Sequence, residues 1–305
     1  MNVLLTGASG FLGSRIYAEL DRIHTVTTLG RTPIAARHIT ADLTKRLPSL
    51  VHASFDYVVH AAGKAHSVPR TTAERTAYEC VNAQGTIRLL AALERMPMRP
   101  KAVVHISTVL VYGRLGGAML DEATPLGAVD CYGLSKVRAE TAVREWGHRT
   151  GISVTILRLP LVLAECSNGN VAAMMNAIRR GYYVRVGKGL TRRSMVRADD
   201  VAAVIDRAAG VGGMFNLTDG HHPGVGELED ALARYVGRPQ PIRSVPVALA
   251  RAVAIVGDGI NAVAGRRFPL DTIALHKLTH SLTFSDESAR CRLGWSPRPV
   301  LDLFR

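Results

Sequence analysis

The stretch Thr6-Gly7-Ala8-Ser9-Gly10-Phe11-Leu12-Gly13, close to the start of the chain, decides the fold that we expect. Residues 2–5 before it suit a short buried strand, and residues 11–20 after it have the apolar spacing of a helix. Glycines between a strand and a helix let the backbone turn tightly and approach a pyrophosphate, whose charge the helix N-terminus stabilises. We therefore expect a dinucleotide site here rather than a plain turn. Its candidate residues are Gly7, Gly10, Phe11, Leu12 and Gly13.

The end of the second predicted strand, residues 25–29, bears on which dinucleotide is bound. A site for NAD usually has an Asp or Glu there, which binds the ribose 2′-hydroxyl. This chain has Gly30-Arg31 instead. A guanidinium binds phosphate well, so we expect NADP, with NAD as the alternative if Arg31 is solvated or stacks on adenine. Asp42 and Leu43 are candidates for the adenine edge.

Two further predicted strands end in small or hydroxyl-bearing residues. Residues 58–60 lead into Ala61-Ala62-Gly63, whose small side chains would leave room for a cofactor. Residues 103–108 end in Ser107 and Thr108. Thr108 can hydrogen-bond a substrate oxygen and hold it in line, and Ser107 is a second candidate for that role.

Tyr132 and Lys136 lie four residues apart at the start of a predicted helix, and so on one face of it. Moving a hydride to or from a carbinol carbon requires moving a proton on its oxygen. The ordinary pKa of Tyr, about 10, is too high for a good base at neutral pH. A nearby ammonium, together with an oxidised nicotinamide, would lower it. Such a pair also occurs as two solvated side chains, so its place after a dinucleotide motif is what predicts proton transfer.

These features together resemble the extended short-chain dehydrogenase/reductases, the nucleotide-sugar epimerase/dehydratase family. Matching stretches continue along almost the whole chain: His60-Ala61-Ala62-Gly63, Asn82 in residues 81–86, Val111-Tyr112-Gly113, residues 193–202 and Leu293-Gly294-Trp295-Ser296-Pro297. The resemblance implies an α/β fold, a Rossmann doubly wound parallel sheet with a smaller C-terminal substrate lobe. It also implies a homodimer that pairs through the helices around residues 76–93 and 132–146.

The resemblance further implies a role for individual residues. The catalytic group is Thr108, Tyr132 and Lys136. Asn82, Ser107 and Pro160 join Ala61, Ala62 and Gly63 as cofactor-binding residues. Lys64, Asn170 and Arg193 are substrate-binding residues, with Arg193 at a place where members often contact a nucleotide diphosphate.

Departures from the family pattern reduce the number of reactions that we expect the chain to catalyse. In the 4,6-dehydratase branch an acidic pair follows the Thr of the catalytic group, whereas here Val109-Leu110 follows Thr108. Because apolar side chains cannot transfer protons, we do not expect dehydration. Leu161 stands where many 4-epimerases have Asn, and Arg197 stands where His is usual. These two changes affect the expected substrate pocket.

The composition of the 305-residue chain is globular, with 47% hydrophobic residues. Its net charge is +13, from 38 Lys+Arg against 25 Asp+Glu. The cations occur in pairs rather than in a run, and the expected ligands are anions, so we expect no nucleic-acid partner. Four cysteines, at positions 80, 131, 166 and 291, have no metal-ligand spacing. We expect no metal, free thiols, no signal peptide and a cytoplasmic location.

Residues 246–265 form the most apolar later stretch, interrupted by Arg251, Asp258 and several glycines. These interruptions disfavour a membrane-spanning helix. We expect a packed helix of the substrate lobe here. A membrane-surface contact through Arg251 and the pair Arg266-Arg267 is the minor alternative.

The alternation of strand and helix patterns up to about residue 160 predicts where the lobes divide. We expect a Rossmann NAD(P)-binding domain over residues 1–160, to which residues 199–218 return. Residues 161–198 and 219–305 would form the substrate lobe. The sequence predicts an oxidoreductase that acts on a nucleotide-diphosphate sugar, with 4-keto-sugar reduction preferred. Two alternatives remain, a 4-epimerase and a non-catalytic NADP-binding regulator.

Overall fold

The computed structural model of the chain describes residues 1–65, 69, 71–165, 169–238, 241–264 and 271–305. Cys166 and the pair Arg266-Arg267 lie outside the described residues. Cys80, Cys131 and Cys291 are free thiols, as expected.

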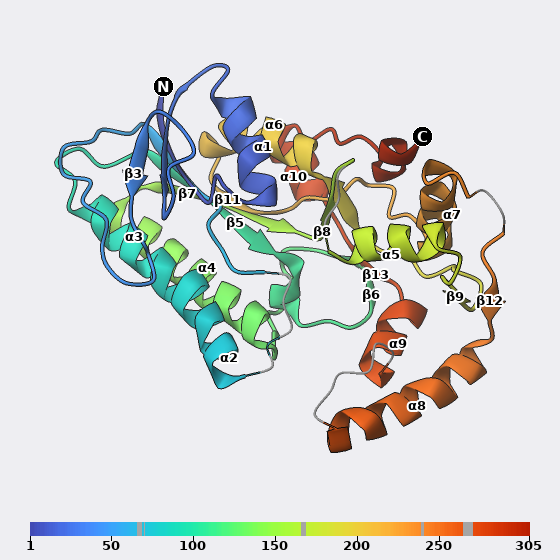
Figure 1. The fold of residues 1–305 in the computed structure, drawn as a ribbon. Coiled ribbons are helices and arrows are strands. Elements are labelled where there is room, and N and C mark those ends of the chain that lie inside the picture. The colour runs from blue at the N-terminus through green and yellow to red at the C-terminus, as the bar shows by residue number, and fades with distance from the viewer. Residues whose placement is uncertain (66–68, 70, 166–168, 239–240, 265–270) are drawn as a thin grey trace.

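Seven parallel strands form the central sheet, in the order β11-β7-β5-β4-β1-β2-β3 (Figure 1). Strand β1 lies between β2 and β4, so the strand order reverses there, which is where open α/β sheets bind ligands. The predicted Rossmann fold is confirmed. The bounds are Asn2–Thr6 (β1), Thr25–Gly30 (β2), His38–Thr40 (β3), Tyr57–His60 (β4), Ala102–Thr108 (β5), Ser153–Leu159 (β7) and Gly213–Asn216 (β11).

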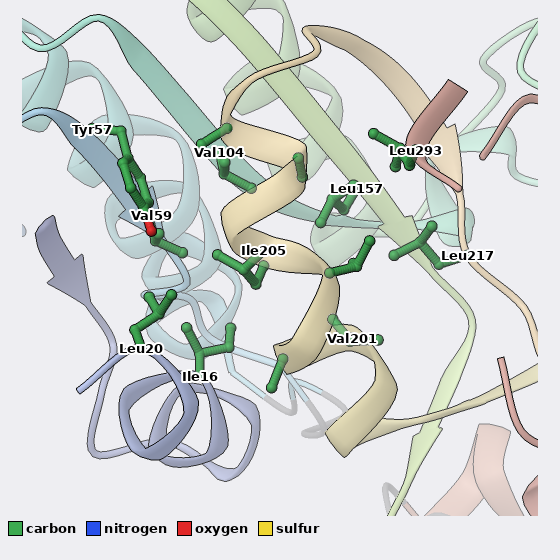
Figure 2. Close-up of a cluster of buried hydrophobic side chains, with 14 of the residues drawn as sticks. Ile16, Leu20, Tyr57, Val59, Val104, Leu157, Val201, Ile205, Leu217 and Leu293 are labelled. Carbon is green, nitrogen blue, oxygen red and sulfur yellow. The ribbon is translucent and has the colours of Figure 1, made fainter. Parts of the chain in front are cut away.

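One face of the sheet is covered by α1 (Phe11–Leu20), α6 (Ala198–Ala209) and α10 (Glu287–Leu293). Alternate residues of the strands point to this face, so aliphatic side chains of sheet and helices fill one continuous core. Figure 2 shows this core, in which Ile16, Leu20, Val201 and Ile205 of the helices meet Val59, Val104 and Leu157 of the strands.

The other face is covered by α3 (Gly85–Glu94) and α4 (Cys131–Thr150). Leu89 and Leu93 of α3 and Val143 and Trp146 of α4 pack with the strand residues that alternate with the first set. The short helix α2 (Thr72–Tyr78) leads into α3 through a π-helical turn, Glu79–Gln84.

The remaining elements lie outside the central sheet. They include three pairs of short parallel strands, β6 with β13, β8 with β10 and β9 with β12. Helices α5 and α7 share a core with the C-terminal 3₁₀ turn Val300–Phe304, and a second 3₁₀ turn, Val109–Tyr112, follows β5. The other bounds are Gly117–Leu120 (β6), Leu161–Leu163 (β8), Asn170–Arg179 (α5), Arg185–Val186 (β9), Met195–Arg197 (β10), Val225–Tyr235 (α7), Ser244–Val245 (β12), Val247–Ala264 (α8), Thr272–Thr279 (α9) and Leu282–Phe284 (β13).

Helix α8 is the apolar segment for which a packed helix was predicted. The helix is confirmed, but packing holds for one face only. Ala250 and Ala254 are buried, whereas Leu249, Ile255 and Val256 are 55%, 60% and 62% exposed. The prediction took apolar side chains as a sign of burial, and the fold turns the large ones outward. Among the described residues, no helix has the length and apolar character to cross a bilayer.

Candidate active site

The glycine stretch forms a tight turn between β1 and α1 that side chains could not occupy. Gly7 has a φ of +77°, and a Cβ on it would lie 2.5 Å from the backbone nitrogen of Ala62. A Cβ on Gly13 would lie 2.0 Å from the carbonyl oxygen of Gly7. The turn is thus packed against the small residues after β4, and Gly10 caps α1. Phe11 and Leu12 open that helix, which has no acidic residue in its first turn to repel a phosphate.

A buried chain of hydrogen bonds supports this turn from behind. Thr6 Oγ1 lies 2.7 Å from His60 Nδ1 and accepts a bond from the backbone N–H of Ala62. His60 Nε2 lies 2.9 Å from Thr86 Oγ1, on α3. Burial lowers the pKa of His60 to about 3, so its ring is neutral and can donate from one nitrogen while accepting at the other. His60 therefore joins β1, β4 and α3 beneath the turn.

Asn82 lies in the π-helical turn and is almost fully buried. Its Oδ1 accepts from the backbone N–H of Lys64 at 2.7 Å, and its Nδ2 donates to the Lys64 carbonyl oxygen. The same Nδ2 donates to Ser135 Oγ on α4 at 2.9 Å. The Asn82 amide thus holds the Gly63–Lys64 loop against α4. The sequence matched this position to the family but did not predict the π-helical turn that directs it, a feature common at functional sites.

Tyr132 and Thr108 lie together at the carboxyl end of β5. Asp130 caps α4 through the backbone N–H of Gly133, which fixes the start of the helix and hence Tyr132. Burial raises the pKa of Tyr132 to about 12, and a hydrogen bond with the Thr108 side chain lowers it only in part. At neutral pH the Tyr132 hydroxyl therefore carries its proton. The expected lowering of this pKa does not occur in the protein alone, because burial outweighs the other influences.

Lys136 lies one turn further along α4, almost fully buried. Its Nζ donates to the carbonyl oxygen of Ile106 at 2.6 Å and lies 3.4 Å from His105 Nε2. Burial lowers the pKa of Lys136 to about 8, against the opposing influence of Glu140. The ammonium charge is thus retained at neutral pH but weakly held.

Ser107 does not share the environment of Thr108. Adjacent residues of a strand point to opposite faces, and the Ser107 hydroxyl donates to Glu140 Oε1 at 2.5 Å. Glu140 in turn pairs with Arg158 at 2.7 Å, with both side chains 1% exposed. Arg158 also donates to the Tyr112 hydroxyl. This buried network commits the Ser107 side chain to the protein interior, and of the two hydroxyls only Thr108 reaches Tyr132.

A cavity of about 430 Å³ opens beside the end of β2. Arg31 and Asp42, both expected at the cofactor, lie on its wall, and Lys45 and Arg46 bring two further cations that the sequence analysis missed. A hydrogen bond from Thr44 lowers the pKa of Asp42, and the charges of Lys45 and Arg31 add to that effect. Leu43, by contrast, is buried in the core between the sheet and α3. The signal for the missed cations was their place one residue after the predicted Asp42-Leu43 pair, beyond Thr44.

The residues predicted to bind substrate lie on separate segments and do not form a single group of contacts. Lys64 lies on the loop after β4, with its ammonium 5.5 Å from the centre of the Tyr78 ring, which itself lies 5.8 Å from the Tyr132 ring. Arg193, before β10, donates to the backbone carbonyl of Lys277 on α9, and burial lowers its pKa. Asn170 opens α5 and is exposed, while the half-buried Pro160 joins β7 to β8. Among the contacts of the described residues, none joins Arg193 or Asn170 to Tyr132.

These groups fit a dinucleotide. The glycine turn is too tight for side chains and leads directly into the N-terminus of α1, which suits a pyrophosphate, and the cationic cavity lies at the end of the neighbouring strand, β2. A model of the family described as the NAD dependent epimerase/dehydratase family matches residues 3–217. The chain belongs to this family.

Relatives in the family differ in the reaction that they are named for. The chain is 27% identical over 297 residues to the N-acetyl-alpha-D-glucosaminyl-diphospho-ditrans,octacis-undecaprenol 4-epimerase of Escherichia coli O157:H7, covering 93% of this chain and 87% of that protein. It is 28% identical over 317 residues to the 4-hydroxy-2-methyl-3-oxo-4-farnesyl-3,4-dihydroquinoline-1-oxide ketoreductase of Stigmatella aurantiaca, covering 98% and 92%.

The fold is shared with solved structures of the epimerase/dehydratase type. One is the UDP-glucose 4-epimerase of Thermotoga maritima, crystallised with UDP-glucose, with a TM-score of 0.76 at 20% identity. The match covers 100% of this chain and 96% of that one. The recognition of the extended short-chain dehydrogenase/reductase family from its motifs is thereby confirmed. The protein is an enzyme of this family, which makes the non-catalytic alternative the weaker hypothesis.

Proposed function

We propose that this enzyme is an NADP-dependent oxidoreductase that acts on the sugar ring of a nucleotide-diphosphate sugar. Its net reaction would be reduction of a 4-keto group, in the synthesis of cell-surface polysaccharide. The observation that carries the proposal is the hydrogen-bonded pair of Thr108 and Tyr132 at the carboxyl end of β5, with Lys136 one turn further along α4. A general acid of this kind suits reduction, because a carbonyl oxygen that receives a hydride must also receive a proton.

A reduced nicotinamide supplies the hydride when it is bound. Thr108 would donate a hydrogen bond to the keto oxygen and hold it beside Tyr132. As negative charge develops on that oxygen, the Tyr132 O–H bond breaks and a carbinol O–H bond forms. The positive charge of Lys136 stabilises the resulting phenolate, which then regains a proton from solvent. His60 and Asn82 act through other groups, since they hold the glycine turn and the Lys64 loop.

The preference for NADP is supported by the charge of the cavity beside β2. Arg31, Lys45 and Arg46 face one carboxylate, Asp42, which already accepts two bonds from Thr44. A 2′-phosphate there would meet three cations. Each charge-assisted contact contributes about 1.5–3 kcal/mol, or roughly ten- to a hundredfold in affinity.

Titration of nicotinamide fluorescence tests the cofactor proposal. Wild type should bind NADPH about ten- to a hundredfold more tightly than NADH, and Arg31→Ala should remove most of that difference. Arg37→Ala is the matched control, because Arg37 is exposed in the same segment but does not line the cavity. Equal affinities for NADPH and NADH in the wild type would contradict the proposal.

A 4-epimerase is the second candidate, favoured by the names of the E. coli relative and of the T. maritima structure. An epimerase removes and returns the hydride within one active site and makes no net use of reduced cofactor. The diphosphate of the substrate would contact Arg193, with Lys64 and Asn170 nearer the sugar. We propose these contacts together with a division into a Rossmann domain, 1–160 with 199–218 returning to it, and a substrate lobe, 161–198 and 219–305.

A further inference from the structure

His105 lies in the middle of β5 and is a fully buried histidine that takes no part in the proposed proton transfer. It lies opposite His60 on the neighbouring strand β4, with the two ring centres 5.3 Å apart. The two rings differ in their hydrogen bonds. Both nitrogens of His60 have partners, whereas among the described residues His105 has a partner at Nε2 only and its buried Nδ1 has none. Internal packing alone does not explain such a histidine, because buried polar groups are normally paired.

The partner of His105 is the ammonium of Lys136, and this decides which ring nitrogen carries the proton. Lys136 Nζ lies 3.4 Å from His105 Nε2 and has N–H donors only, so Nε2 accepts. Burial and the charge of Lys136 hold the pKa of His105 well below its usual range, and the ring is therefore neutral. Its single proton lies on Nδ1, the nitrogen without a partner in the described part of the chain. The fold thus leaves one buried N–H unpaired, which is destabilising, and places a lone pair against Lys136.

The other titratable groups near Lys136 leave its ammonium without a carboxylate of its own. Burial lowers the pKa of Lys136, and Glu140, one turn further along α4, offsets only part of this while it pairs with Arg158. Tyr132, one turn earlier, carries its proton at neutral pH. His60 on β4 is neutral, because burial and the charge of Lys136 lower its pKa to about 3. The ammonium therefore depends on hydrogen bonds from neutral groups.

We propose that His105 is a positioning residue for Lys136, and that its Nε2 lone pair holds the ammonium charged and in place one turn from Tyr132. Among the described residues it supplies the one side-chain acceptor within hydrogen-bond range of Nζ, and the Ile106 carbonyl supplies a backbone acceptor. An ammonium has three donors, so these two acceptors leave one N–H for a ligand. The inference rests on the proposed function, in which the Lys136 charge stabilises the Tyr132 phenolate.

A neutral imidazole suits this position better than a carboxylate or an apolar side chain. Accepting a hydrogen bond from a lysine favours its charged form, which opposes the effect of burial. A carboxylate would do this more strongly, but its negative charge would cancel much of the field that Lys136 exerts on Tyr132. An apolar side chain would remove one of the two acceptors, and the pKa of Lys136 would fall further. His105 thus supports the charge of Lys136 without neutralising it.

Two variants of similar size separate hydrogen bonding from packing at this position. Gln has an amide oxygen that reaches the place of His105 Nε2, whereas Met has a similar length and only a weakly accepting thioether. His105→Gln should therefore behave like the wild type, and His105→Met should lower the pKa of Lys136. His105→Asn is a third, polar variant. Its shorter amide reaches only the place of Nδ1, so it should act like His105→Met.

Urea unfolding of the cofactor-free chain from pH 6 to 10 measures the pKa of Lys136 in the folded protein. Each variant is compared with the same variant carrying Lys136→Met, so that a loss of packing at position 105 cancels in the difference. Because folding lowers the pKa of Lys136, stability rises with pH above the folded pKa, which is about 8 in the wild type. This rise should begin at the same pH in His105→Gln, and about 0.5–1 pH units lower in His105→Met and His105→Asn. The falling limb of turnover against pH should shift by the same amount.

An onset of this rise in His105→Met and His105→Asn equal to that of the wild type would overturn the inference, and so would an equal shift in His105→Gln. A loss of stability that persists beside Lys136→Met, with no change of onset, would make His105 a packing residue only. The unfolding series contains no cofactor or substrate, so its outcome is separate from that of the reaction. A shifted onset without a shifted turnover profile would support the contact with Lys136 and contradict the proposed function.

Discussion

Replacing Lys136 by Met should abolish most activity and yet stabilise the protein. Lys136 is almost fully buried, and burial lowers its pKa from 10.5 to about 8. The fold therefore holds an ammonium that would be more stable in water. Met has a similar length and no charge, so Lys136→Met removes this penalty while it removes the charge that supports Tyr132 and the cofactor.

The expected gain in the free energy of unfolding follows from how far the pKa of Lys136 is lowered. This lowering of the pKa corresponds to about 3 kcal/mol between the charged and neutral forms. Loss of the bond to the Ile106 carbonyl offsets about 1 kcal/mol of that. We expect Lys136→Met to raise the free energy of unfolding at pH 7 by about 2 kcal/mol, and Tm by roughly 4 °C.

The stability advantage of Lys136→Met over the wild type should decrease as the pH rises. Below pH 8 Lys136 is charged in both the folded and unfolded states, so the wild type bears the full penalty. Between pH 8 and 10.5 the unfolded chain holds the proton and the folded protein has lost it, so wild-type stability rises with pH relative to the variant. The advantage of the variant should therefore shrink across this window and vanish near its upper end.

Urea unfolding of wild type and Lys136→Met from pH 6 to 10 measures this difference. Lys101→Met is the control, because Lys101 is exposed and its loss should give no pH-dependent difference. A Lys136→Met variant that is less stable than wild type at pH 7, or a difference that does not change with pH, would refute the reasoning. Retention of wild-type turnover would refute the functional part.

Four further outcomes are expected. Tyr132→Phe should keep the fold and cofactor binding and lower turnover by about 10²–10⁴, and steady-state rates near those of wild type would exclude Tyr132 as the acid. Turnover of the wild type should fall as the pH rises through about 8, where Lys136 loses its charge, whereas a flat profile up to pH 10 would argue against a role for that charge. Glu140→Gln leaves Arg158 buried without its carboxylate and should cost about 3–5 kcal/mol in urea unfolding; an unchanged midpoint would contradict that pairing. The chain should sediment as a homodimer through α3 and α4, where Ile87 is 42% and Leu134 39% exposed, and monomer alone at micromolar concentration would oppose this.

The parts of the fold that depend on neighbouring residues could be predicted from the sequence. The glycine turn was predictable because Gly7 and Gly13 meet steric limits set within a few residues, or by the small-residue turn after β4. The strands of the main sheet are buried on both faces, so their apolar runs mark them directly. The proximity of Tyr132 and Thr108 followed from the family pattern.

Features that depend on distant partners could not be predicted. Ser107 and Thr108 look alike in sequence, and only the pairing of Glu140 with Arg158 shows why the Ser107 hydroxyl points inward. The direction of α8 depends on which face α9 covers, and a uniformly apolar segment carries no signal for that choice. The role of Asn82 depends on a π-helical turn whose sequence resembles any helix.

The central claim is that the enzyme makes net use of a reduced cofactor on a keto sugar. The most direct measurement is to incubate the pure protein with NADPH and a 4-keto-sugar nucleotide, and to follow the absorbance of reduced nicotinamide and the sugar product together. We predict that one NADPH is consumed for each carbinol formed, and that Tyr132→Phe lowers both rates by about 10²–10⁴. No NADPH consumption, together with interconversion of 4-hydroxy epimers of a nucleotide sugar, would contradict the claim and establish the epimerase instead.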